Sequence, residues 1–541
     1  MYFREYNQTR FLLIDSNIKL RMIMDEYLKS YGAWFIDFAA DAIEAVEKCQ
    51  NGIFDVVICD YNLGAKNGQQ VLEELRHRKF LKHTSLFIMM SADTTKDMVL
   101  GAIEYQPDAY ISKPITRDPL KQRLDNLLLD SEALYDIKYS IDCDDIDEAI
   151  YLCEQKIRKR SKYSSWCNKT KSSLLLQTKQ YDEAKAVYND VLKTRPLLWA
   201  KIGLARVAIE EQQYSVAEPI LQEILKNNPL CLTAYDLLAD IYVYTQRKKA
   251  AQETLLEAVS HSPRAIQRHV RLGELCIENQ DYDVATEAFR NATEHGEQSV
   301  FQNANNYLNF ARCLHETSTT LDRPLRFSRS EEALNAIEHI KKRFEEEDKV
   351  SFQSSMIKAR VHNTCEQNKE AGQALDDAQQ FYLMVASELK PEVAMEYAQT
   401  LFTLNKESEA ELVLTQLSAL HQNDEALIKK IEALRDEPVS SQDRIKAAEL
   451  NKMGIQHFES GDHRRAIDVF QDALAYSPRH PALNLNLIQV LMKLMPTEQD
   501  SSESLQLCQQ CLERVSHIKS DHKQYKRYQF LIKKLEKLAV A

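Results

Sequence analysis

Four polar residues in the first part of the chain each follow a short apolar run. The runs and the residues that close them are 11–14 with Asp15, 54–59 with Asp60, 86–90 with Ser91, and 109–112 with Lys113. Two carboxylates suit a hard divalent cation such as Mg2+, and a lysine with a hydroxyl suits phosphoryl oxygens. A carboxylate that attacks a phosphoryl group becomes an aspartyl phosphate. The combination indicates phosphoryl transfer to an aspartate.

The apolar runs must be the elements that position these side chains. They are short, rich in β-branched and aromatic residues, and not alternating, as expected of strands buried on both faces of a parallel sheet. Amphipathic segments of helical length lie between them, for example 18–30 and 41–51. This alternation predicts a doubly wound α/β domain. Ligands bind at the carboxyl ends of strands in such sheets, so the four polar residues should converge.

Residues 8–128 resemble the receiver domain of two-component response regulators. The resemblance rests on Asp60, on Gly68 eight residues later, and on Ser91 and the pair Lys113-Pro114. It implies a five-stranded parallel sheet and a phosphoryl group accepted from a sensor histidine kinase or phosphotransfer protein. It also implies a cis Lys113-Pro114 peptide. The implied roles are Mg2+ binding for Asp15, Asp60 and the backbone carbonyl of Asn62, phosphoryl binding for Ser91 and Lys113, and a rotating switch aromatic for Tyr110.

Two positions depart from the receiver pattern. Receivers usually have two adjacent acidic residues after the first strand, whereas this chain has Asp15-Ser16. A serine hydroxyl is a weak, neutral ligand, so we expect weaker Mg2+ binding and slower phosphoryl transfer. Gly64 stands where proline is usual, which loosens a loop but removes no chemical group. A pseudo-receiver, folded but never phosphorylated, therefore remains the alternative.

The composition indicates a soluble folded protein without a nucleic-acid-binding module. Of the 541 residues, 44% are hydrophobic and 28% charged, and the net charge is −12. The densest basic stretch, 156–162, is typical of a solvated helix end. Residues 1–6 contain no apolar signal core, no stretch reaches the ~18 apolar residues of a membrane helix, and the 11 cysteines are scattered. We therefore expect a cytoplasmic protein with no membrane insertion.

The one close cysteine pair, Cys508-x-x-Cys511, lies inside a predicted amphipathic helix, 505–515. A structural zinc site usually needs four ligands, and no second pair lies nearby. We therefore expect buried helix cysteines.

The rest of the chain is poor in glycine and carries an internal repeat. Small residues recur at Ala184, Ala217, Ala251 and Ala285, spaced by 33 or 34 residues, and prolines recur with the same spacing. This pattern resembles the tetratricopeptide repeat, which pairs antiparallel helices that must stack to bury their apolar faces. The resemblance is strong over 165–297 and 447–480. Between these ranges we expect repeats with longer turns, a long loop at 317–330, and finally a capping helix at 520–541.

These patterns predict an α/β doubly wound five-stranded parallel receiver domain followed by an all-α solenoid that resembles tetratricopeptide repeats. The predicted parts are a receiver at 1–128, connecting helices at 129–163, a solenoid at 164–435, a linker at 436–446, and C-terminal repeat and capping helices at 447–541.

No catalytic set is visible in the helical part, so we expect no separate enzyme activity. A solenoid offers a long surface suited to peptides or helices, so we expect a protein or peptide partner on its concave face. The order of parts resembles auxiliary response regulators of the VieB type by architecture alone. We expect coupling to pass through 94–106 and 110–128. The alternative is a constitutive scaffold whose pseudo-receiver only docks.

Overall fold

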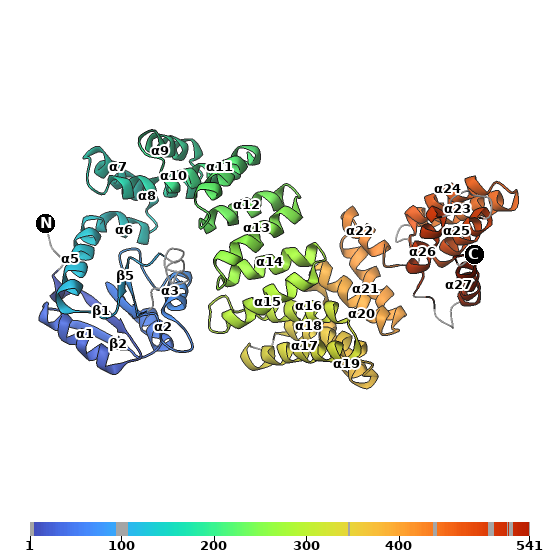
Figure 1. Ribbon diagram of the computed structural model, residues 1–541, viewed down its shortest axis with the longest axis horizontal. Helices are drawn as coiled ribbons and strands as arrows, with labels where there is room; N and C mark the ends of the chain where they lie inside the picture. Colours follow the sequence, from blue (N-terminus) through green and yellow to red (C-terminus); the bar gives the residue numbers. More distant parts are fainter. Residues whose placement is uncertain are drawn as a thin grey trace. The chain divides into compact units, whose positions relative to one another are not determined.

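The computed structural model describes residues 5–92, 106–344, 347–435, 441–495, 502–516, 518 and 523–539. The chain divides into two compact units, Met1–Phe344 and Glu345–Ala541, which are treated separately below. The first unit contains a sheet followed by helices, and the second is helical in its described residues (Figure 1).

A parallel five-stranded sheet opens the first unit, as predicted. Its strands are β1 (Arg10–Ile14), β2 (Phe35–Ala39), β3 (Val56–Asp60), β4 (Leu86–Ser91) and β5 (Ala109–Ser112). Their order is β2-β1-β3-β4-β5, and every neighbouring pair is parallel. Every residue of β3 and β4 is buried, which explains why these segments are continuously apolar rather than alternating.

Helices cover both faces of this sheet. They are α1 (Ile18–Ser30), α2 (Ala42–Asn51), α3 (Gly68–His77) and α5 (Arg117–Ala133), preceded by a 3-10 turn, η1 (Tyr6–Gln8). One apolar cluster joins α1 and α5 to strand residues such as Leu13 and Ile58, and another joins α2 and α3 to residues such as Leu12 and Val57. Successive strand residues point to opposite faces, so each strand serves both clusters. The doubly wound arrangement is confirmed. Helix α5 extends beyond the predicted receiver boundary at residue 128.

The remainder of the first unit is a series of helices. They are α6 (Tyr135–Asp142), α7 (Ile146–Arg158), α8 (Ser164–Gln177), α9 (Tyr181–Thr194), α10 (Leu198–Glu210), α11 (Tyr214–Asn227), α12 (Leu232–Tyr244), α13 (Lys248–His261), α14 (Ile266–Glu278), α15 (Tyr282–Gly296), α16 (Ala304–Ser318) and α17 (Arg323–Arg343). The turn inside each pair from α6/α7 to α14/α15 contains a residue with φ of 59–62°. These residues are Asp144, Lys179, Gln212, Gln246 and Gln280. The repeat of the sequence is therefore also a repeat of backbone conformation.

The expected long loop at 317–330 is wrong. Helix α16 continues to Ser318 and α17 begins at Arg323. Asp322 accepts a hydrogen bond from the Leu325 amide and Pro324 occupies the first turn, both of which start helices rather than interrupt them.

The second unit consists of helices and one 3-10 turn in its described residues. They are α18 (Asp348–Thr364), α19 (Asn368–Val385), η2 (Ala386–Glu388), α20 (Pro391–Thr403), α21 (Glu407–Leu420), α22 (Glu425–Glu432), α23 (Ser441–Glu459), α24 (His463–Tyr476), α25 (Pro481–Leu494), α26 (Ser502–Arg514) and α27 (Tyr525–Ala539). Residues 441–446 of the predicted linker belong to α23, and 436–440 lie outside the described residues. The predicted capping helix corresponds to α27.

Small residues permit close helix packing within these pairs. A Cβ atom added to Gly273 would lie 2.5 Å from the Phe289 ring, and one added to Gly454 would lie 2.6 Å from the Phe470 ring. Both rings are buried, Phe289 completely and Phe470 to within 1% exposure. Glycine is therefore required at these points by contact between side chains rather than by a special φ.

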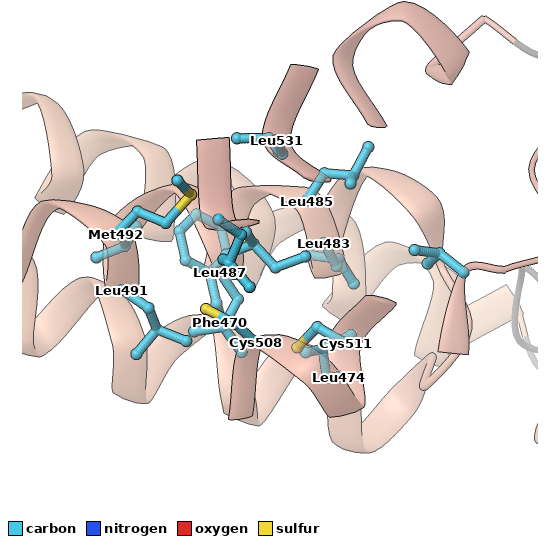
Figure 2. Close-up of a cluster of buried hydrophobic side chains, with 14 of the residues drawn as sticks. Phe470, Leu474, Leu483, Leu485, Leu487, Leu491, Met492, Cys508, Cys511 and Leu531 are labelled. Carbon is cyan, nitrogen blue, oxygen red and sulfur yellow. The ribbon is translucent and has the colours of Figure 1, made fainter. Parts of the chain in front are cut away.

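Cys508 and Cys511 lie in the apolar core of the second unit. Figure 2 shows them beside Phe470, Leu474 and Leu487, within a cluster built from α24, α25, α26 and α27. Both side chains are fully buried, and burial raises the pKa of each thiol. The prediction of buried helix cysteines is confirmed.

Candidate functional site

The four polar residues identified in the sequence lie at the carboxyl ends of adjacent strands. Asp15 follows β1, Asp60 ends β3, Ser91 ends β4, and Lys113 follows β5. The Lys113 ammonium nitrogen, Nζ, lies 3.0 Å from Asp15 Oδ2 and 3.0 Å from Asp60 Oδ1. One lysine therefore bridges the two carboxylates.

Backbone hydrogen bonds fix the strand ends that carry these side chains. The Tyr61 amide donates to the Met90 carbonyl at 2.7 Å, and the Lys113 amide donates to the Ser91 carbonyl at 2.8 Å. Helix α3 begins close to the acceptor strand, because a Cβ atom on Gly68 would lie 2.4 Å from the Asp60 carbonyl oxygen. The glycine eight residues after Asp60 therefore lets α3 start against the end of β3.

Burial and charge act in opposite directions on Asp60. Burial raises the pKa of the Asp60 carboxyl, and the Asp15 carboxylate raises it further. The hydrogen bond and charge of Lys113 lower it, as does the Asn62 amide, but the net shift is upward. Burial also lowers the pKa of Lys113, yet its hydrogen bonds to Asp60 and Asp15 outweigh that effect and raise it. Lys113 is thus a stable cation at neutral pH.

Asp15 is held by its own turn. Its Oδ1 atom accepts from the Asn17 amide at 2.8 Å, and the residue is only 3% exposed. The Arg21 guanidinium donates to the Asp15 backbone carbonyl. Ser16, in contrast, is exposed. The sequence analysis missed Arg21, since a basic residue on an amphipathic helix carries no signal that it turns back toward the preceding strand.

Few side chains at this site can serve as ligands of a hard divalent cation. Asp15 and Asp60 supply two carboxylates, and carboxylate oxygens are ligands that Mg2+ accepts. In the described part of the chain, no group of three or more histidine, cysteine or acidic side chains is arranged to hold a metal ion. Ser16, next to Asp15, contributes no carboxylate.

Ser91 and Tyr110 lie on the neighbouring strands. Ser91 is 3% exposed and is paired in register with Ser112 of β5. Tyr110 is half-buried and packs against the cluster that contains Phe87 and Met89. The Lys113-Pro114 peptide is cis, as predicted. Of the expected coupling face, 94–105 lie outside the described residues.

Comparison with known proteins agrees with this geometry. The model of the response regulator receiver domain matches residues 11–125. Tetratricopeptide repeat models match 170–196, 232–264 and 457–494. This chain carries a response regulator receiver domain followed by tetratricopeptide repeats. The resemblances stated from sequence are confirmed for both parts.

Individual relatives match the receiver in size. Chemotaxis protein CheY-3 of Vibrio cholerae is 28% identical over 118 residues, which are 22% of this chain and 90% of that protein. Chemotaxis protein CheY of Pseudomonas aeruginosa is 25% identical over 118 residues, covering 22% and 94%. Among solved structures, response regulator protein TrrA from Thermotoga maritima, in complex with Mg2+–BeF, is 28% identical with a TM-score of 0.20, covering 22% of this chain and 98% of that one.

Within the ranges that the structure describes, no helix has both the length and the apolar character required to cross a membrane.

Proposed function

We propose that this protein is a phosphorelay response regulator in which Asp60 accepts a phosphoryl group and the repeats provide a protein-binding output. The observation that carries the proposal is the bridge from Lys113 Nζ to Asp60 Oδ1 and Asp15 Oδ2, each at 3.0 Å. It places a cation beside a carboxylate at the edge of a parallel sheet, where ligands bind.

In the proposed reaction, an Asp60 carboxylate oxygen attacks the phosphorus of a phosphohistidine. A P–O bond forms, the P–N bond breaks, and the histidine nitrogen takes the electron pair. Lys113 exchanges its bond to Asp60 for one to a phosphoryl oxygen, so its positive charge stays beside the added negative charge. Ser91 would hold a second phosphoryl oxygen, and Tyr110 would act as the switch aromatic.

Asp15, Asp60 and the Asn62 carbonyl would hold Mg2+, and the bound ion would neutralise charge on the transferred group. Because Ser16 contributes no carboxylate, we expect this binding to be weaker than in receivers with an acidic pair. The same residue supports the second candidate, a pseudo-receiver that acts as a scaffold without phosphorylation.

The output is proposed to be binding of a protein or peptide by the repeats, not of nucleic acid. The repeat matches at 170–196, 232–264 and 457–494 support this, because stacked repeats present extended surfaces to peptides and helices. The net charge of −12 also disfavours a surface that binds the phosphate backbone of a nucleic acid. We further propose that the chain has no separate catalytic site and acts in the cytoplasm.

Treatment of the full chain with acetyl phosphate and Mg2+ tests the proposal. We expect an acid-stable, base-labile phosphoryl adduct, detected by mass spectrometry, that is lost in Asp60→Ala. Asp37→Ala is the control, since Asp37 is an exposed aspartate on β2 of the same sheet. If the wild type is not modified, the scaffold function is favoured. If Asp60→Ala is still modified, another residue is the phosphoryl acceptor.

A further inference from the structure

One face of helix α3 in the receiver contacts the repeats of the same unit. Gln70, Glu73 and His77 are spaced by three and four residues, so they lie on one side of the helix. They meet the end of α15 and the segment 297–301 that follows it, more than 200 residues later in the chain.

Four interactions form this receiver–repeat contact. The Gln70 side-chain amide donates to the His295 carbonyl at 3.4 Å, and the Ser299 hydroxyl donates to Glu73 Oε2 at 3.1 Å. The His77 and Phe301 rings meet edge to face, with centroids 5.2 Å apart. The Arg264 guanidinium donates to the Tyr61 hydroxyl at 3.2 Å. Ser299 is only 6% exposed.

Charged side chains of the repeats lie near Glu73. A cavity of about 190 Å3 is lined by Glu73 together with residues of α12, α14 and the preceding turn, among them Asp236, Arg268 and Arg271. The Arg268 guanidinium forms two 2.8 Å hydrogen bonds to Asp236, which hold it in place. Glu73 of the receiver therefore lies beside a part of the repeats whose two arginines are each ion-paired to an aspartate of α12.

The contact is joined directly to the proposed acceptor. Tyr61 follows Asp60 in the chain, and its carbonyl accepts from the Gly68 amide at 2.8 Å. The same glycine packs against the Asp60 carbonyl oxygen. A change in the loop between Asp60 and Gly68 would therefore move both Tyr61 and the start of α3.

We propose that residues 264–301 of the repeats hold the α3 face of the receiver in the unphosphorylated protein, and that phosphorylation of Asp60 weakens this contact. The inference rests on the proposed function. The contact occurs together with the Lys113–Asp60 ion pair, the arrangement that phosphorylation would replace. Anything that binds one arrangement better than the other shifts the balance between them. Helix α3 of the receiver therefore occupies this surface until Asp60 is phosphorylated.

Reciprocity makes the proposal measurable. If phosphorylation weakens the contact, then breaking the contact must strengthen binding of a phosphoryl analogue by the same factor. Binding of beryllofluoride with Mg2+ to the full chain is measured by calorimetry for the wild type and for Arg264→Ala/Phe301→Ala. Both substitutions lie on the repeats, outside the receiver. The control is Phe327→Ala, which removes a large, exposed side chain of α17.

We expect affinity for beryllofluoride to be about fivefold or more tighter in the double variant and unchanged in the control. Hydrogen exchange of residues 297–303 in the wild type should also accelerate when beryllofluoride binds, and this should not occur in Asp60→Ala. Each single variant is measured as well. If loss of Phe301 unfolds its segment locally, Arg264→Ala still tests the contact without that effect.

Unchanged or weaker affinity in the double variant, with unchanged exchange in the wild type, overturns this inference and leaves the proposed function standing. A wild type that binds no beryllofluoride overturns both.

Discussion

Replacing Gly454 with alanine tests the close packing on which the repeats depend. An added Cβ atom would lie 2.6 Å from the Phe470 ring, about 0.8 Å short of the 3.4 Å at which ordinary contact begins. The ring is 1% exposed and has other buried side chains around it, so it cannot simply move aside. Overpacking of this kind costs about 1–3 kcal/mol.

Gly372 supplies the matched control in the same unit. It also lies inside a helix, α19, but no atom lies within 4 Å of its added Cβ position. Alanine is favoured over glycine in a helix interior by about 0.8–1 kcal/mol, and both variants gain that term. We therefore expect Gly372→Ala to stabilise α19, and Gly454→Ala to be about 1–3 kcal/mol less favourable than Gly372→Ala.

The measurement is hydrogen exchange by mass spectrometry on the full chain. Local exchange is preferred because a chain with two units has no single unfolding free energy. Protection of α24 should fall in Gly454→Ala, whereas protection of α19 should rise in Gly372→Ala. Adding Phe470→Leu to Gly454→Ala should lose less than the sum of the two single changes, because the smaller side chain leaves room for the methyl group.

Equal stabilisation by the two alanines would refute the reasoning. It would mean that the Phe470 ring does not lie against Gly454, and the interpretation of the same arrangement at Gly273 would fail with it.

Three further predictions concern the receiver site and the C-terminal core. Ser16→Asp should tighten Mg2+ binding roughly tenfold by adding a carboxylate, measured by calorimetry, whereas Ser30→Asp at the end of α1 should not; equal affinities would show that Ser16 is remote from the ion. Burial lowers the pKa of Lys113, but the hydrogen bonds to Asp60 and Asp15 raise it by more, so the net shift is upward. The stability that Lys113 adds to the folded state is therefore complete below its unfolded pKa of about 10.4, and it is lost as the pH rises through the higher folded value. Denaturation between pH 8 and 12 should therefore show an alkaline loss that is smaller in Lys113→Met, and identical profiles would contradict the ion pair. Cys508→Ser should destabilise α26 by about 1–3 kcal/mol because it buries a hydroxyl among apolar side chains, while a chelator should leave wild-type exchange in α26 unchanged; a chelator effect would instead indicate a bound metal.

The convergence of Asp15, Asp60 and Lys113 was predictable because parallel strands end at one edge of a sheet. A polar residue at the end of each apolar run is therefore a local signal with a three-dimensional meaning. The repeats were predictable for a related reason, since each helix pair must present the same small residues to its neighbours and this requirement leaves a fixed period in the sequence.

The segment 317–330 was predicted incorrectly although its helix signals were present. Asp322 caps α17 and Pro324 lies in its first turn, yet the stretch that contains Asp322-Arg323-Pro324 was interpreted as a loop. Proline has opposite meanings at the start and in the interior of a helix, so the prediction depended on where the helix begins.

The sequence alone determined the classes of the two parts and the residues that meet at the carboxyl ends of the strands. Each of these follows from local composition or from a regular spacing of residues. Only the tertiary structure decided that Lys113 bridges both carboxylates and that the α3 face of the receiver meets Arg264, Ser299 and Phe301. A contact between single side chains separated by more than 200 residues leaves no periodic pattern, because it depends on how helices stack between the two sites rather than on either segment by itself.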